Sequence, residues 1–227
     1  MKRIIVVGAS AGGVASLGQF VAGLPEDLDE PIFIVLHVPA NSISSLPAIL
    51  SAVGSRSAKH AKDGEQFIPR RIYVAPPDHQ LLIARGHLVV KKAPREHRYR
   101  PSIDALFRSA AYIYGTRVIG IVLSGALEDG TSGLWYIKHM GGIAMVQDPK
   151  EAPFASMPRS AMKEVDIDHV AAAAEMGALL RQLVHKSPRS ELHSVPTLRK
   201  MFRLNIGISK LTALLAKRPA NATKPSG

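Results

Sequence analysis

The chain has 227 residues, 46% of them hydrophobic, so it is long enough to bury one sizeable core with an appendage. It contains no cysteine, which excludes a disulfide framework, a thiolate metal site and a cysteine nucleophile, and which suits a reducing cytoplasm. The formal net charge of +11 is concentrated at the C-terminal end, where residues 186–227 hold nine Lys and Arg residues and one acid.

Met1 is followed by two basic residues and a short apolar run, and this run ends in a glycine-rich turn after residue 7. It is too short for the apolar region of a signal peptide. No other stretch approaches the ~18 apolar residues that a membrane-spanning helix needs. We therefore expect an unexported, cytoplasmic protein.

Three apolar, β-branched runs predict buried strands of a parallel sheet at residues 3–7, 31–36 and 117–123. Helical periodicity follows the first two runs, at residues 14–21 and 43–50. Strands that alternate with helices indicate an α/β fold with a doubly wound, mostly parallel sheet and helices on both faces, similar to a Rossmann fold.

Further elements follow in chain order. A small antiparallel hairpin is predicted over residues 80–92, and a helix is predicted over residues 103–114 with Ser102 as its N-cap. Asp104, in the first turn of that helix, is expected to be structural because a carboxylate is stabilised near the positive end of the helix dipole. The other predicted elements are strands at residues 71–74, 143–147 and 167–170 and a helix at residues 172–184.

The C-terminal part predicts a basic extension, so that residues 1–185 form the globular domain and residues 186–227 form the extension. Residues 198–217 place their apolar side chains near one face of a helix, which either docks on a partner or packs back onto the domain. A basic extension suits contact with an acidic protein or an anionic membrane surface, and we expect no nucleic acid partner.

Residues 8–13, GASAGG, match the G-x-S-x-G pattern of a nucleophile elbow and present Ser10 between the first strand and the first helix. Backbone N–H groups at the start of such a helix can bind an oxyanion. The same strand, turn and helix also describe a dinucleotide site. Two features count against that alternative: Ser10 replaces the middle glycine, and the second strand ends in His37 where an acidic ribose ligand is expected.

His37 and Ser10 end neighbouring predicted strands. Adjacent parallel strands lie ~5 Å apart and finish at the same edge of a sheet, so the two side chains could meet. Asp129 and Asp148 also follow strands at this edge, and their spacing does not choose between them as the third member of a triad. The order Ser, His, Asp disfavours the α/β-hydrolase fold, in which the acid precedes the histidine.

Several motifs between about residue 3 and residue 184 together resemble the catalytic domain of CheB-type protein-glutamate methylesterases. They are GASAGG at 8–13, LHVP at 36–39, YVAP at 73–76, RPSIDALF at 100–107, SGALEDG at 124–130 and MPR at 157–159. The resemblance implies that Ser10 is the nucleophile, His37 the base and Asp129 its orienting partner.

The resemblance further implies that the backbone N–H groups of Ala11 and Ala126 form the oxyanion hole and that Met157 belongs to the substrate-facing rim. The implied reaction removes methyl esters from glutamate side chains on the cytoplasmic helices of a methyl-accepting chemotaxis receptor, with deamidation of receptor glutamines by the same triad. It requires no metal and no organic cofactor. The alternative is a weakly catalytic or non-catalytic docking module that keeps the same fold.

The sequence departs from the family pattern in three places. Ala11 stands where the family usually has Thr, and Ala126-Leu127 replaces the usual Met-Gly. Family enzymes commonly carry an N-terminal receiver domain, whereas this chain begins at the first catalytic strand. We therefore expect an esterase activity that phosphodonors leave unchanged.

Overall fold

A computed structural model describes residues 3–96 and 98–186 of the chain. The basic extension, including the amphipathic helix predicted at residues 198–217, lies outside the described residues apart from Lys186. The division into a domain and an extension therefore stays a prediction. Within the described part of the chain, no helix has the length and apolar character required to cross a bilayer.

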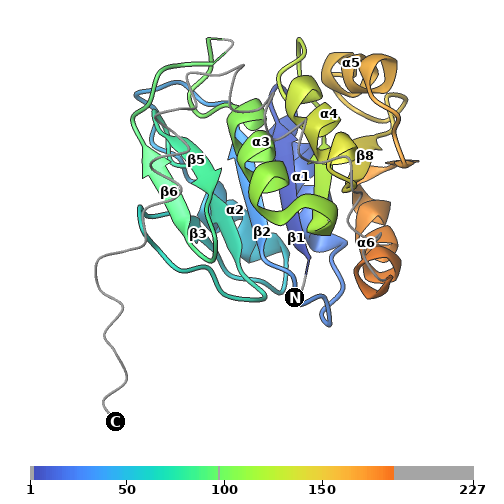
Figure 1. Ribbon diagram of the computed structural model, residues 1–227, viewed down its shortest axis with the longest axis horizontal. Coiled ribbons are helices and arrows are strands. Elements are labelled where there is room, and N and C mark those ends of the chain that lie inside the picture. The colour runs from blue at the N-terminus through green and yellow to red at the C-terminus, as the bar shows by residue number, and fades with distance from the viewer. Residues whose placement is uncertain (1–2, 97, 187–227) are drawn as a thin grey trace. The chain divides into compact units, whose positions relative to one another are not determined.

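The centre of the fold is a seven-stranded, fully parallel sheet in the order β3-β4-β2-β1-β7-β8-β9 (Figure 1). Its strands are β1 (Ile4–Ala9), β2 (Ile32–Leu36), β3 (Ala58–His60), β4 (Ile72–Val74), β7 (Val118–Val122), β8 (Ile143–Gln147) and β9 (His169–Ala171). The antiparallel hairpin consists of β5 (Gln80–Ile83) and β6 (Leu88–Lys91). The predicted doubly wound α/β fold with a small hairpin is confirmed.

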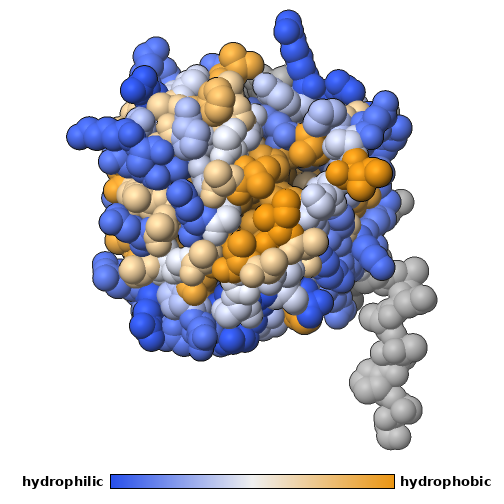
Figure 2. Space-filling view, turned by 180° about the vertical axis from the view of Figure 1, so that it is seen from behind, coloured by the Kyte–Doolittle hydropathy of each residue, from blue (hydrophilic) through white to orange (hydrophobic). Residues whose placement is uncertain are grey.

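Helices cover both faces of the sheet (Figure 1). One face carries α3 (Ile103–Tyr114), α4 (Thr131–His139) and α5 (Ser156–Glu164), and the other carries α1 (Gly13–Ala22), α2 (Leu46–Val53) and α6 (Met176–His185). Side chains of a strand alternate between the two faces, so Ile4 and Val6 of β1 join one core while Ile5 and Val7 join the other. Figure 2 shows the molecule from the side of α1 and α2, with apolar side chains near the centre of that face.

The predicted helix at residues 103–114 is confirmed in its bounds, and Ser102 caps it by accepting a hydrogen bond from the Ala105 N–H. The helix predicted at 172–184 is a 3₁₀ turn, η2 (Ala173–Glu175), followed by α6. Ile43 lies outside α2 and is fully exposed, since that helix begins only at Leu46.

Three of the strands and α-helices were not predicted from the sequence. The edge strand β3 spans only three residues around a lysine, so it contains no apolar run. Helices α4 and α5 bury only three residues each, and α5 is polar over most of its length. Their apolar periodicity is therefore too weak to predict a helix.

Candidate active site

Ser10 lies in a tight turn between β1 and α1, at the carboxyl edge of the sheet. Its N–H donates to the Ser124 carbonyl oxygen at 2.9 Å, and its own carbonyl accepts from the Gly13 N–H at 2.8 Å. Gly12 adopts a φ of 69°, which favours glycine, and a Cβ there would meet Pro153 Cβ at 2.8 Å. The turn therefore needs small residues, and it leaves the Ser10 side chain partly exposed.

His37 directly follows β2, and its N–H extends the ladder to the neighbouring strand by donating to the Ala9 carbonyl at 3.1 Å. Its Nδ1 lies 3.1 Å from Ser10 Oγ, and its Nε2 lies 2.7 Å from Asp129 Oδ2. A neutral histidine whose Nε2 carries the hydrogen and donates to Asp129 leaves Nδ1 free to accept the Ser10 proton. This geometry suits a general base.

Tyr99 stacks on the His37 ring, with ring centroids 3.6 Å apart and planes inclined by 7°. The contact covers one face of the imidazole and restricts its rotation, so that both ring nitrogens stay aligned with their partners. Sequence reasoning missed Tyr99, because nothing in the sequence places the segment before α3 against the end of β2.

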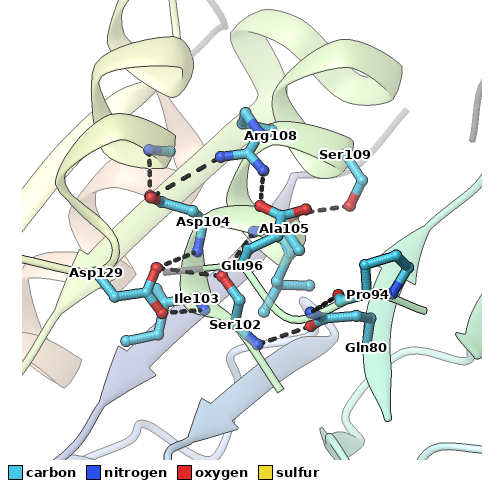
Figure 3. Close-up of polar contacts among 12 residues, drawn as sticks. Gln80, Pro94, Glu96, Ser102, Ile103, Asp104, Ala105, Arg108, Ser109 and Asp129 are labelled. Atoms are coloured by element: carbon cyan, nitrogen blue, oxygen red, sulfur yellow. Dashed lines mark hydrogen bonds and ion pairs between the residues drawn. The ribbon is translucent and has the colours of Figure 1, made fainter. Parts of the chain in front are cut away.

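Asp129 is held by the N-terminus of α3 (Figure 3). Oδ2 accepts from the Ile103 N–H at 2.8 Å, and Oδ1 accepts from Ser102 Oγ and from the Asp104 N–H, both at 3.2 Å. The Asp129 side chain has no exposed surface. Backbone donors and the helix dipole both stabilise a carboxylate in this position, so they fix Asp129 in the orientation that His37 requires.

The pKa of Asp129 reflects opposing causes. Burial raises it, but the hydrogen bond and charge of His37 and the N–H groups of Ile103 and Asp104 outweigh burial, so the pKa lies below its ordinary value. Asp129 is therefore a carboxylate at neutral pH.

This lowered pKa predicts a pH-dependent contribution to stability. A carboxyl with a depressed folded-state pKa stabilises the fold above its unfolded pKa, about 4, and loses that contribution as the pH falls through the folded value. The difference in unfolding free energy between wild type and Asp129→Asn should therefore shrink below about pH 4. Urea unfolding at several pH values measures it, with Ile121→Val, a buried apolar change, as the pH-independent control. A difference that grows toward low pH would contradict the assignment.

Asp104 has the structural role predicted for it. Its Oδ1 accepts from the Gly130 N–H at 3.1 Å and from the Gly133 N–H at 2.6 Å, which joins the start of α4 to the first turn of α3. These two hydrogen bonds fix the C-terminal end of the loop that carries Asp129.

The other candidate acid, Asp148, lies elsewhere on the same edge. Its Oδ1 accepts from the Lys150 N–H at 2.9 Å, and its own N–H donates to the Ala171 carbonyl, so it shapes the turn after β8. The structure brings Asp129, and not Asp148, to His37.

Ser124 joins three loops around Ser10. Its Oγ donates to the Ala11 carbonyl at 2.8 Å and accepts from the Phe154 N–H at 2.9 Å. Its N–H donates to Gln147 Oε1 at 2.7 Å. Sequence reasoning missed this role, because a buried serine in a loop carries no pattern of its own.

Comparison with known proteins places this geometry in a family. The model of the CheB methylesterase family matches residues 5–180. The chain belongs to this family. The solved catalytic domain of Thermotoga maritima CheB methylesterase superimposes with a TM-score of 0.77 at 31% identity, covering 81% of this chain and 100% of that one.

Relatives with curated names agree with the family model. A protein of Leptospira interrogans named putative protein-glutamate methylesterase/protein-glutamine glutaminase is 38% identical over 180 residues, which cover 79% of this chain and 93% of the relative. A protein of Geobacter metallireducens named protein-glutamate methylesterase/protein-glutamine glutaminase 1 is 36% identical over 77% of this chain. The match covers 49% of the Geobacter relative, so the chain aligns with about half of that protein.

The CheB resemblance also implied positions for an oxyanion hole. Ala11 and Ala126 both lie in partly exposed turns at the carboxyl edge of the sheet. Among the described residues, the N–H of neither alanine donates to a backbone carbonyl. Both N–H groups are thus candidates for binding a developing oxyanion, and their role stays a prediction.

Met157 does not face a substrate, contrary to the expectation from the sequence. It is fully buried in the core beneath α5, and its side chain fills the space that a Cβ on Gly125 would need. Its N–H donates to the Gly125 carbonyl at 3.0 Å. The start of α5 turns this side chain inward, so Met157 supports the loop between Ser124 and Asp129 from below.

A pocket of about 410 Å³ lies beside the Asp129 end of the triad in this CheB-family site. Besides Asp129, it is lined by Arg98, Tyr99, Leu127, Glu128, Ser156 and Ser160. Apart from Asp129, the pocket lining offers one cation, one acid, three hydroxyl groups and one apolar side chain, a combination that suits part of a peptide substrate.

Proposed function

We propose that the chain is a protein-glutamate methylesterase that hydrolyses methyl esters on glutamate side chains of a methyl-accepting chemotaxis receptor. The observation that carries the proposal is the continuous hydrogen-bond chain from Ser10 through His37 to Asp129, at the sheet edge of a CheB-family domain. We assign Ser10 as nucleophile, His37 as general base and Asp129 as the group that orients and stabilises the histidine.

In the proposed reaction, Ser10 Oγ attacks the ester carbonyl carbon while His37 Nδ1 accepts the hydroxyl proton. The imidazolium formed is stabilised by the Asp129 carboxylate and gives its proton to the leaving methoxide, which departs as methanol. Water then attacks the acyl-enzyme, His37 accepts a water proton, and the glutamate is released as Ser10 recovers its hydrogen. With a glutamine substrate the same steps release ammonia.

Charge develops on the carbonyl oxygen in both tetrahedral intermediates. We assign its stabilisation to the backbone N–H groups of Ala11 and Ala126, which lie on the two loops that Ser124 holds together. The intact triad and its buried acid disfavour the alternative of a docking module without catalysis, since a docking surface has no use for an aligned proton relay.

The test is methanol release from membranes that contain a methylated receptor, with the purified full chain. The proposed function predicts release that is proportional to enzyme and stops when the receptor is demethylated. Binding to these membranes without methanol release would favour the docking module.

The receptor partner and the compartment follow from the proposed activity. The methylated glutamates would lie on cytoplasmic helices of the receptor, so we propose a cytoplasmic location for the enzyme. We also propose that the basic residues of 186–227 contact an acidic protein or the anionic membrane surface near the receptor.

Removal of residues 193–227 takes away seven of the nine basic residues in this segment while keeping Lys186, whose carbonyl accepts from Arg3 at 3.1 Å. Added salt shortens the screening length from ~10 Å at 0.1 M to ~3 Å at 1 M. Sedimentation with receptor membranes should therefore show salt-sensitive binding of the full chain and weak binding of the shortened chain at every salt concentration. Equal, salt-insensitive binding of both chains would exclude electrostatic recruitment.

A further inference from the structure

Leu127 has an unfavourable backbone conformation. Its φ is 66°, in the left-handed region that side chains with a Cβ avoid. The positive φ values at Gly12 and Gly130, on either side of the same site, are taken by glycines. A leucine at this position therefore costs the folded state free energy that a glycine would not.

Packing does not offset this cost, because Leu127 is 63% exposed. An apolar side chain stabilises a fold in proportion to the area that it removes from water, and most of this side chain stays in water. Leu127 is thus strained and exposed at once, and strained residues of this kind cluster at functional sites.

The position of Leu127 indicates what it contacts. Leu127 lies two residues before Asp129, and like Tyr99 it lines the pocket. Its carbonyl oxygen accepts a hydrogen bond from Ser156 Oγ at 3.3 Å. Ser156 begins α5, and the loop just before this helix carries Phe154, which is 51% exposed. The Phe154 ring comes within 3.1 Å of where a Cβ on Gly12 would lie, beside the nucleophile turn.

We propose that Leu127 and Phe154 determine substrate specificity by contacting the apolar side of the receptor helix whose methylated glutamate reaches Ser10. The proposal rests on the proposed methylesterase function. One apolar side chain stands at the Asp129 end of the triad and the other at the Ser10 end. A helix that lies across both would bury them while its ester enters between them.

The experiment compares Leu127→Gly and Leu127→Asn with wild type in methanol release from methylated receptor membranes. Both variants tolerate a positive φ and remove the apolar contact. Loss of a partly exposed leucine contact should raise KM roughly tenfold, with a smaller change in kcat. The thermal midpoint should equal or exceed that of wild type, because strain is relieved.

Arg70→Gly is the matched control, since Arg70 also has a positive φ, of 60°, and precedes β4. It therefore lies at the amino ends of the parallel strands, away from the carboxyl ends where Leu127 lies. It should leave KM unchanged. The proposal would be overturned if KM stayed unchanged in both Leu127 variants. It would also be overturned if their thermal midpoints fell so far that unfolding explained the loss of activity. Absence of methanol release by wild type would instead refute the proposed function itself.

Discussion

Ser10→Ala and His37→Ala should each reduce methanol release on the order of 10⁶-fold, and the double variant should be hardly slower than either single variant. The reason is that the hydroxyl is a weak nucleophile without its base, and the base has no role without the hydroxyl. The 3.1 Å separation between Ser10 Oγ and His37 Nδ1 makes the two act as one unit.

Initial rates with methylated receptor membranes measure this effect, and thermal midpoints show whether each variant folds. His139→Ala, an exposed histidine near the end of α4 that stacks on Trp135, is the matched control and should retain full activity. If the fold-loss of rate in the double variant equalled the product of the two single losses, Ser10 and His37 would act independently, which contradicts a triad.

Asp129→Asn should lower kcat on the order of 10⁴-fold, as expected when an orienting aspartate is replaced. The amide carries no charge to stabilise the imidazolium, and its NH₂ group can turn toward His37 Nε2 and favour the tautomer with the hydrogen on Nδ1. In that tautomer Nδ1 cannot accept the Ser10 proton. Ser102 Oγ and the Asp104 N–H donate to the other oxygen, Oδ1, and would keep the side chain in place, so the loss should appear in kcat rather than in KM.

Asp148→Asn provides the comparison, because Asp148 follows a neighbouring strand at the same edge and its carboxylate bonds only to the turn after β8 among the described contacts. It should cost far less activity than Asp129→Asn. The reverse ranking would mean that the wrong acid has been assigned.

The sheet and the placement of Ser10 and His37 at its carboxyl edge could be predicted because they depend on local patterns. Apolar β-branched runs mark the buried strands, and polar residues directly after those runs must share one edge of a parallel sheet. The choice between Asp129 and Asp148 could not be made in this way. It depends on the N-terminus of α3, whose backbone N–H groups bind Asp129 across the fold.

The surroundings of the triad were beyond sequence reasoning for a similar reason. Tyr99, Ser124 and the buried orientation of Met157 depend on contacts between loops that are distant along the chain. The apolar periodicity of a sequence, 2 residues for a strand and 3.6 for a helix, predicts local secondary structure and gives no information on such contacts. The ring nitrogen that faces each partner of His37 likewise follows from three-dimensional placement alone.

Ester hydrolysis by this enzyme should pass through an acyl group on Ser10, and partitioning of this intermediate tests that most directly. A receptor peptide that carries either a methyl or an ethyl ester on the same glutamate is hydrolysed in the presence of hydroxylamine, and the ratio of hydroxamate to glutamate is measured. Both esters leave the same acyl-enzyme, so the account predicts the same ratio for both. A ratio that differs between the two esters would contradict a common intermediate on Ser10.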